Sequence, residues 1–235
     1  RELIDLKDDG SFRLNMKYFN YATGLTMTNE KFSKLFGKNV RDPEKELLTQ
    51  FHMDIASSIQ AVTEEIVLKL TTSISKETNI KNLCMAGGVA LNCVANGKIL
   101  KKNIFKNIWF QPAAGDAGGS LGAALAFWYQ ELGNKREFSL NKDQMSGSYL
   151  GPSFNDEEIE NTLKSIGAVY EKKKEEDLIS LVAKELDDKK TVGWFQGRME
   201  FGPRALGARS IIADARSDKM QRELNLKIKF RESFR

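Results

Sequence analysis

Residues 191–210 read TVGWFQGRMEFGPRALGARS, and this stretch decides how the whole chain is interpreted. The apolar run at residues 191–195 has the composition of a buried strand. The segment that follows carries three arginines, one carboxylate and three glycines, at Arg198, Arg204, Arg209, Glu200, Gly197, Gly202 and Gly207. Arginine offers a planar fork of donors, and glycine lets the backbone approach an anion closely. The stretch therefore predicts a strand that opens into a phosphate-binding loop.

The positive charge of the chain is local to this end of the sequence. Residues 196–235 carry 10 Arg or Lys residues against 5 Asp or Glu residues, a net charge of +5. The whole chain has a net charge of +4, so the residues before Gln196 sum to −1. A solvated loop with surface arginines is the alternative interpretation. Such loops rarely interleave Arg so densely with Gly, Pro and Phe.

Composition indicates a soluble globular protein of one large or two small domains. The chain has 235 residues, of which 41% are hydrophobic and 29% charged. No apolar run approaches the ~20 residues that span a bilayer, and no signal peptide is visible, so we expect a cytoplasmic protein without a membrane partner. Cys84 and Cys93 lie in apolar context, which favours buried, reduced thiols. The absence of an initial Met and the basic end at residues 227–235 indicate a piece of a longer polypeptide.

Periodicity predicts an α/β fold. The first forty residues indicate antiparallel or irregular β structure, and Asp42 with Pro43 predicts the start of a long helix that continues past Thr72. Strands at 80–85 and 108–111 alternate with helices at 89–101 and 117–130, which predicts a buried, partly parallel sheet. After a polar boundary at 133–151, Asn155 with Glu158 predicts a capped helix. Further helices are expected near 178–186 and 217–228.

Two glycine-rich turns follow the predicted parallel strands. The first, MAGGVALN at residues 85–92, places Gly87 and Gly88 before a helix whose free N–H groups point at a ligand. Asn92 would reach a ribose or base. The turn matches neither the Walker A loop nor GxGxxG, and tight strand–helix packing is an equal alternative.

The second turn, AGDAGGSLGAA at residues 114–124, carries Gly115, Asp116, Gly118 and Gly119. Asp116 stands where a helix N-cap is expected, and its alternative role is to hold a metal or orient a phosphate. The glycines leave room for a ligand or for close helix packing. Two such turns on consecutive strands resemble the adenosine-cradling half of the actin/hexokinase-like ATPase fold.

Four patterns together resemble the O-carbamoyltransferases of antibiotic and nodulation-factor biosynthesis: GGVALN, GDAGGSLGAA, GWFQGRMEFGPRALGARSI and NLKIKFRESFR. The match runs over most of the chain. The resemblance implies an α/β protein in which residues 1–145 form the C-terminal part of an actin-like ATPase-fold domain. Residues 150–235 would then open a YrdC-like α/β domain.

The resemblance implies a two-step reaction. The YrdC-like domain joins carbamoyl phosphate and ATP to give carbamoyladenylate, and the first domain transfers the carbamoyl group to a hydroxyl of a small-molecule acceptor. Two polyanions meet in the first step, and basic side chains would offset their repulsion. The expected catalytic residues are Arg198, Arg204, Arg209, Lys227 and Arg231, with Lys229 adding charge beside the nucleotide. Glu200 would orient an arginine rather than touch substrate.

Nucleotide and metal sites are also implied by the resemblance. The residues expected to bind ATP are Gly87, Gly88, Asn92, Gly115, Gly118, Gly119, Ser210 and Lys229. Asp116 matches the metal-ligand aspartate of the family, with Mg²⁺ or Fe²⁺ as the metal. The HxxxH pair of the family is missing, and His52 is interpreted as a packing or surface residue. The metal site is therefore incomplete, and we expect the isolated chain to be a poor catalyst.

Other functions remain open at this stage. A threonylcarbamoyl-adenylate enzyme acting on tRNA would share the domains, although the EFGPRALG-type motif favours the O-carbamoyl group. A nucleic-acid-binding module would use the basic end on phosphates, but the stretch has few aromatic residues for stacking. A sugar kinase or ATPase of the same fold is a third possibility. The acceptor, the metal identity and the formation of a homodimer are not fixed by any motif.

Overall fold

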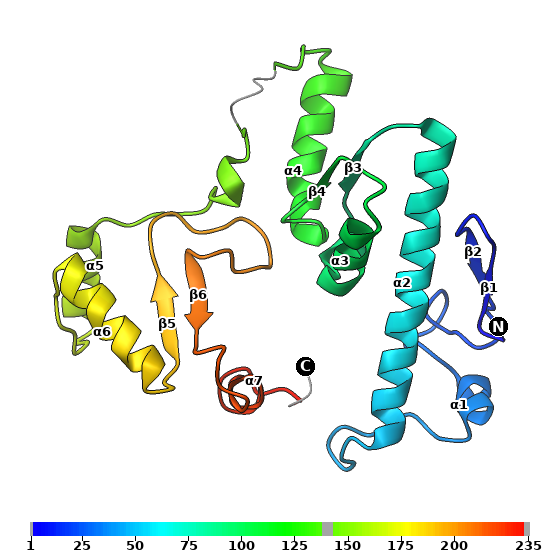
Figure 1. The fold of residues 1–235 in the computed structure, drawn as a ribbon, viewed down its shortest axis with the longest axis horizontal. Helices are drawn as coiled ribbons and strands as arrows, with labels where there is room; N and C mark the ends of the chain where they lie inside the picture. The colour runs from blue at the N-terminus through cyan, green and yellow to red at the C-terminus, as the bar shows by residue number, and fades with distance from the viewer. Residues whose placement is uncertain (1, 138–142, 233–235) are drawn as a thin grey trace. The chain divides into compact units, whose positions relative to one another are not determined.

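The computed structural model describes residues 2–137 and 143–232, in two compact units at Arg1–Gln111 and Pro112–Arg235 (Figure 1). Each unit is described by itself. Helices and small sheets are mixed in both, which is consistent with the α/β class. The assignment to an ATPase-fold domain and a YrdC-like domain stays a prediction. None of the helices in the described ranges combines the length and apolar character needed to cross a membrane.

The first unit opens with an antiparallel hairpin, as predicted. Strand β1 (Ile4–Leu6) pairs with β2 (Phe12–Leu14), with Ile4 opposite Leu14. Helix α1 (Glu30–Phe36) was not predicted. It begins at Asn29, whose side chain accepts hydrogen bonds from two backbone N–H groups of the first turn.

The predicted start of the long helix is wrong. Helix α2 spans Gln50–Thr78 and begins eight residues after Asp42. The Asp42 carboxylate instead accepts a hydrogen bond from the Glu44 N–H at 3.0 Å, a local turn that competes with helix. The Thr49 N–H donates to His52 Nδ1 at 3.0 Å, so His52 caps α2. A capping role agrees with the interpretation of His52 as a structural residue.

The parallel sheet is present as two short strands. Strand β3 (Asn82–Met85) pairs with β4 (Asn107–Phe110) in parallel, as predicted. Between them the predicted helix is broken at Asn92 into a 3-10 turn, η1 (Gly88–Leu91), and α3 (Cys93–Lys102). Helix α3 packs on α2 around a buried cluster of apolar residues, Val67, Ala95, Ile99 and Phe105.

The prediction that the two cysteines are buried is wrong, because Cys84 and Cys93 are both exposed and free. Side chains alternate between the faces of a strand, and the core-packed residues Leu83 and Met85 take the inner face of β3. Cys84 therefore faces outward. Cys93 is the first residue of α3, whose buried positions are Ala95 and Ile99.

The second unit begins with α4 (Asp116–Ala126), which continues into a π-helical turn, η2 (Phe127–Glu131). A short turn, η3 (Ser146–Ser148), precedes α5 (Asp156–Ser165) and α6 (Glu175–Asp187). The capping box is confirmed: the Asn155 N–H donates to Glu158 Oε2 at 2.8 Å, and the Glu158 N–H donates to Asn155 Oδ1 at 2.9 Å.

The predicted strand at residues 192–195 is confirmed as β5 (Val192–Phe195). It pairs antiparallel with β6 (Arg209–Ile212), a strand that was not predicted. The register sets Phe195 opposite Arg209, so the predicted loop ends at Ala208. The chain then forms α7 (Met220–Glu223) and a π-helical turn, η4 (Leu224–Ile228), within the helix expected at 217–228.

Candidate anion-binding site

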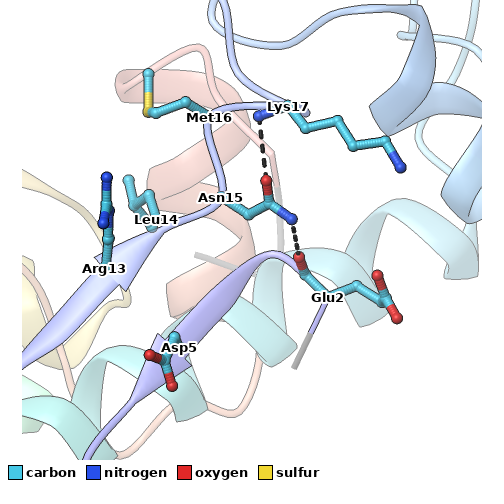
Figure 2. Close-up of a pocket in the computed structure, with 7 residues that line it drawn as sticks. All are labelled: Glu2, Asp5, Arg13, Leu14, Asn15, Met16 and Lys17. Carbon is cyan, nitrogen blue, oxygen red and sulfur yellow. Dashed lines mark hydrogen bonds between the residues drawn. The ribbon is translucent and has the colours of Figure 1, made fainter.

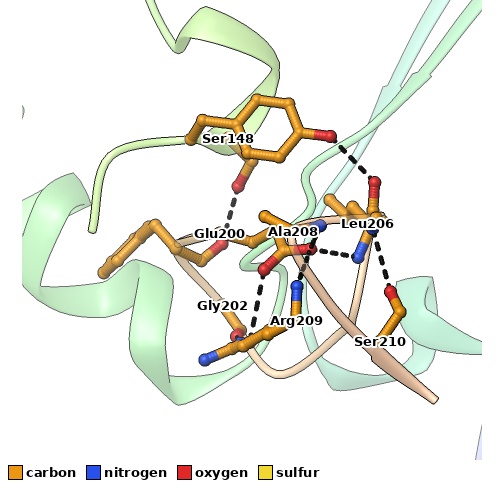
Figure 3. A network of polar contacts seen from close by, with 10 residues as sticks. Ser148, Glu200, Gly202, Leu206, Ala208, Arg209 and Ser210 are labelled. Atoms are coloured by element: carbon orange, nitrogen blue, oxygen red, sulfur yellow. Dashed lines mark hydrogen bonds and ion pairs between the residues drawn. The ribbon is translucent and has the colours of Figure 1, made fainter. Parts of the chain in front are cut away.

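The arginine-bearing loop, residues 196–208, connects β5 to β6. Its base is closed by a hydrogen bond from the Gln196 N–H to the Ala208 carbonyl at 2.8 Å. Glu200 lies at the centre of the loop, and only 2% of its surface is exposed. Figure 3 shows its side chain surrounded by the backbone of the same loop. A buried carboxylate requires fixed donors around it, because desolvating a charge is costly.

Backbone N–H groups supply those donors. Glu200 Oε1 accepts hydrogen bonds from the N–H groups of Leu206 at 2.6 Å, Ala208 at 2.8 Å and Arg209 at 3.3 Å. Burial acts to raise the pKa of this carboxyl, but the backbone donors outweigh burial and lower the pKa to about 2. Glu200 is therefore an anion at any physiological pH.

Arg209 is held by the same carboxylate. Its Nε lies 3.5 Å from Glu200 Oε2, and its Nη2 donates to the Gly202 carbonyl (Figure 3). Arg209 is also the first residue of β6, so its backbone is fixed by the pairing with β5. The prediction that Glu200 orients an arginine agrees with this contact.

Arg198 is anchored from the other side of the loop. Its Nη1 donates to the Gly151 carbonyl at 2.6 Å, and the Gly151 N–H donates to the Met199 carbonyl at 2.9 Å. A guanidinium carries five N–H donors, so one anchoring bond leaves it able to bind an anion. Arg204 lies exposed near the tip of the loop. The structure thus places Arg198 and Arg204 on the loop and Arg209 at the start of the strand that follows it.

A cavity of about 430 Å³ adjoins Arg198. Its lining residues come from the base of the loop and from the segment before α5: Tyr149, Gln196, Gly197, Arg198 and Ala208. A cavity of this size is in the range that small ligands occupy. It directly borders Arg198, one of the predicted catalytic residues.

The segment before α5 clamps the loop. The Ser148 hydroxyl donates to the Phe201 carbonyl at 2.6 Å, and the Phe201 N–H donates to the Ser148 carbonyl at 2.6 Å. The Tyr149 hydroxyl donates to the Leu206 carbonyl at 2.8 Å. Sequence analysis did not identify Ser148 or Tyr149, because their partners lie more than fifty positions away and the segment has the composition of a linker.

The second glycine motif meets the loop. A methyl group at Gly202, where φ is +115°, would lie 3.0 Å from the Pro112 carbonyl oxygen and 3.1 Å from Ala113 Cα. Only glycine fits both the backbone angle and this close approach. The start of the turn that leads into α4 therefore packs against the loop within the second unit.

Within that turn the predicted residues differ in their surroundings. Gly115 is the N-cap of α4, and Asp116 is its exposed first residue rather than the N-cap. A methyl group at Gly118 would overlap the Ala113 carbonyl oxygen, so Gly118 is required for packing. Gly119 borders open space, which a ligand would be able to enter.

The metal prediction gains no support from these surroundings. Across residues 2–137 and 143–232, no group of three or more His, Cys, Asp or Glu side chains is placed to hold a metal ion. Asp116 therefore has no fellow ligands in the part of the chain that the structure describes. We derive no chemical step through a metal, and Mg²⁺ or Fe²⁺ stays a prediction.

The first glycine motif lies in the first unit. A methyl group at Gly87 or Gly88 would meet no atom within 4 Å, so the turn is open. Asn92 caps α3 and pairs with Gln60 of α2, to which its Nδ2 donates at 2.9 Å. Its amide group is thus occupied by the protein in this structure, and its expected contact with a nucleotide stays a prediction.

The basic residues near the C-terminal end follow the opposite end of β6 from the loop. Lys227 pairs with Glu223 at 3.4 Å on the surface, and Lys229 is exposed. Arg231 Nε donates to the buried Asn225 Oδ1 at 2.7 Å. Ser210, also predicted to bind nucleotide, accepts a hydrogen bond from the Gly207 N–H at 3.2 Å. No contact that we describe joins the 227–231 segment to the loop.

A larger cavity, of about 460 Å³, lies beside the β1–β2 hairpin (Figure 2). Its lining residues carry both signs of charge: Glu2, Asp5, Arg13, Leu14, Asn15, Met16 and Lys17. The Asn15 side chain spans from the Glu2 carbonyl to the Lys17 N–H and serves the local turn. No predicted site residue lines this cavity, so the arginine-bearing loop is the better candidate.

Two family models match the chain. The carbamoyltransferase N-terminus matches residues 1–125, and the carbamoyltransferase C-terminus matches residues 183–235. These matches confirm the resemblance on which the sequence interpretation rests. They do not test the proposed boundary between two domains at residues 145–150, which stays a prediction.

The chain is also similar to longer curated proteins. It is 62% identical to the uncharacterized protein sll1178 of Synechocystis over 99% of this chain and 38% of that protein. It is 43% identical to nodulation protein NolNO of Sinorhizobium fredii, over 80% of this chain and 27% of that protein. With nodulation protein NolO of Bradyrhizobium diazoefficiens it shares 34% identity over 100% of this chain and 40% of that protein. The chain thus spans less than half the length of these relatives.

Proposed function

The chain belongs to the carbamoyltransferase family, and we propose that its arginine-bearing loop helps to form carbamoyladenylate from carbamoyl phosphate and ATP. The carbamoyl group then passes to a hydroxyl of a small-molecule acceptor. Because the chain spans part of its relatives, this activity is proposed for the full-length protein. The observation that carries the proposal is the buried Glu200, which holds both the loop bearing Arg198 and Arg204 and the side chain of Arg209, the residue that follows the loop.

The chemistry explains why such a loop is needed. Carbamoyl phosphate, ATP and one water give carbamoyladenylate, pyrophosphate and inorganic phosphate. The acceptor hydroxyl oxygen then attacks the carbamoyl carbon, AMP leaves with the bonding electrons, and the hydroxyl proton is released. Bringing two polyanions together is opposed by their charge, and preorganised guanidinium groups offset that repulsion without reorganising during the reaction.

The acceptor class is inferred from the family resemblance and from relatives named as nodulation proteins. A hydroxyl on a sugar or another natural product is the acceptor we propose. The basic surface of the loop also fits RNA phosphates. The partly apolar lining of the cavity beside Arg198 favours a small ligand over a nucleic-acid backbone.

Pyrophosphate release by the full-length protein tests the proposal. We expect release from ATP only when carbamoyl phosphate is present. An Arg204→Ala variant should lose most of it, whereas Arg222→Ala, on the exposed surface of α7, should retain it. Release that ignores carbamoyl phosphate, or equal loss in both variants, would contradict the proposal. Formation of ADP without pyrophosphate, and without any need for carbamoyl phosphate, would favour a kinase or ATPase.

A further inference from the structure

The backbone of the arginine-bearing loop forms a nest for an anion, and the protein fills that nest itself. Three N–H groups, from Leu206, Ala208 and Arg209, converge on a single oxygen of Glu200. Concave sets of backbone N–H groups commonly bind phosphate. Here those donors are taken by a buried carboxylate, so these three N–H groups are not available to a substrate phosphate.

The same carboxylate links the nest to a guanidinium. One oxygen accepts from the backbone, while the other lies 3.5 Å from Arg209 Nε and accepts no hydrogen bond that we describe. Glu200 is therefore the single group on which both the loop backbone and the Arg209 side chain depend. Removing it would leave three buried donors without an acceptor and an arginine without its partner.

A second anchor acts on the same residues from outside the loop. The Tyr149 hydroxyl donates to the Leu206 carbonyl, whose own N–H donates to Glu200. Leu206 is thus held at both of its backbone polar groups by side chains. Tyr149 also lines the cavity that adjoins Arg198, so the residue that anchors the loop is also part of the cavity lining.

We propose that Glu200 is a positioning residue that acts as an internal anion, holding the arginine-bearing loop and Arg209 ready for the substrate phosphate, with Tyr149 as a second anchor. The inference rests on the proposed function for its substrate. Neither residue is required to touch that substrate. What they determine is affinity, because a disordered loop must be ordered before it binds.

The test uses the full-length protein and its Glu200→Ala and Tyr149→Phe variants. The KM for carbamoyl phosphate in Glu200→Ala should rise about tenfold or more, the scale expected when charge-assisted hydrogen bonds are lost. Formate, which fits the vacated nest, should lower that KM again. Tyr149→Phe should show a smaller rise in KM with kcat unchanged. Glu157→Ala, on the exposed side of α5, is the control and should not respond to formate.

Amide hydrogen exchange of residues 204–209, measured without substrate, is independent of the reaction. Exchange should be faster in Glu200→Ala and slow again in formate. A folded Glu200→Ala variant with wild-type exchange and KM would overturn the inference, as would a loss of protection that formate does not reverse. If Glu200→Ala does not fold, the Tyr149→Phe variant tests the inference instead. Wild-type exchange and a wild-type KM in Tyr149→Phe would refute the proposal that the loop is anchored by these side chains. A wild-type protein that releases no pyrophosphate would refute the proposed function, while the exchange measurement would still decide the role of Glu200.

Discussion

Glu200 gives the loop a dependence on pH that can be derived from its surroundings. Burial alone would raise the pKa of the carboxyl, but the backbone donors lower it from 4.5 to about 2. The folded state therefore binds a proton at this group less readily than the unfolded state does. The resulting stabilisation is complete above pH 4.5 and is lost as the pH falls from there toward 2.

A Glu200→Gln variant of the full-length protein should show this effect directly. The wild type should be more stable at pH 7, and its advantage should shrink as the pH falls below 4.5, because the carboxylate becomes neutral like the amide. Urea unfolding of both proteins between pH 7 and pH 2.5 measures the difference. A gap that stays constant over this range would contradict the assignment.

Gly202 is the second residue with a sharp structural requirement. Its φ of +115° and its approach to Pro112 and Ala113 leave no room for a side chain. We expect Gly202→Ala to lower the free energy of unfolding by about 1–3 kcal/mol, the usual cost of a strained backbone position. Gly119→Ala is the matched control, because Gly119 lies within α4 beside open space and alanine favours helix there. Equal effects in the two variants would refute the packing role of Gly202.

The arginines of the candidate anion-binding site could be predicted from residue types, whereas the residues that hold the loop from outside could not. Arg198, Arg204 and Arg209 were predicted because arginine and glycine are interleaved around them. The structure places the first two on the loop and Arg209 directly after it, at the start of β6. Ser148 and Tyr149 were not predicted, because a serine and a tyrosine in a polar stretch carry no signal until their distant partners are known. The exposure of Cys84 and Cys93 was not predicted either. Both lie in apolar sequence context, but tertiary packing decides which face of each element is buried.

Among the elements, helix starts were predictable where the cap is local. Asn155 and Glu158 satisfy each other within one turn, and the predicted start of α5 is confirmed. The start of α2 was predicted too early, because the Asp42 carboxylate accepts a hydrogen bond within a local turn and does not cap a helix. Strand β6 was missed because its residues follow a glycine-rich loop and pair only after that loop folds back.

The capping box of α5 allows a quantitative prediction. Replacing Asn155 with Ala removes the acceptor for the Glu158 N–H, and the loss in stability should be about 1 kcal/mol. Asn161→Ala, at an exposed position inside the same helix, is the control and should not lower stability, because alanine favours a helix interior over asparagine. Denaturant unfolding of both variants measures the difference, and a neutral Asn155→Ala would contradict the cap.

For the whole molecule, the distribution of apolar surface is the informative feature. Helix α4 and the turn η2 bury none of their residues by themselves, and Phe127 and Trp128 are 59% and 52% exposed. Parallel strands usually lie in sheets covered on both faces, whereas β3 and β4 form a sheet of two strands. We expect the isolated 235-residue chain to bind the dye ANS strongly and to unfold with low cooperativity. Weak ANS binding equal to that of the full-length protein would contradict this expectation.

The isolated chain should also fail to complete the reaction. The arginine-bearing loop is internally anchored, so binding of carbamoyl phosphate should persist where the loop is ordered. Acceptor transfer would need the nucleotide and metal contacts predicted for the other motifs, and Asp116 has no fellow metal ligands among the described residues. We therefore expect the chain alone to show carbamoyl phosphate binding by calorimetry, with carbamoylation of added sugar acceptors at least about a hundredfold below the full-length protein, the scale of losing one major electrostatic contribution. Turnover of the isolated chain at the full-length rate would show that its own residues suffice for both steps and would contradict this expectation.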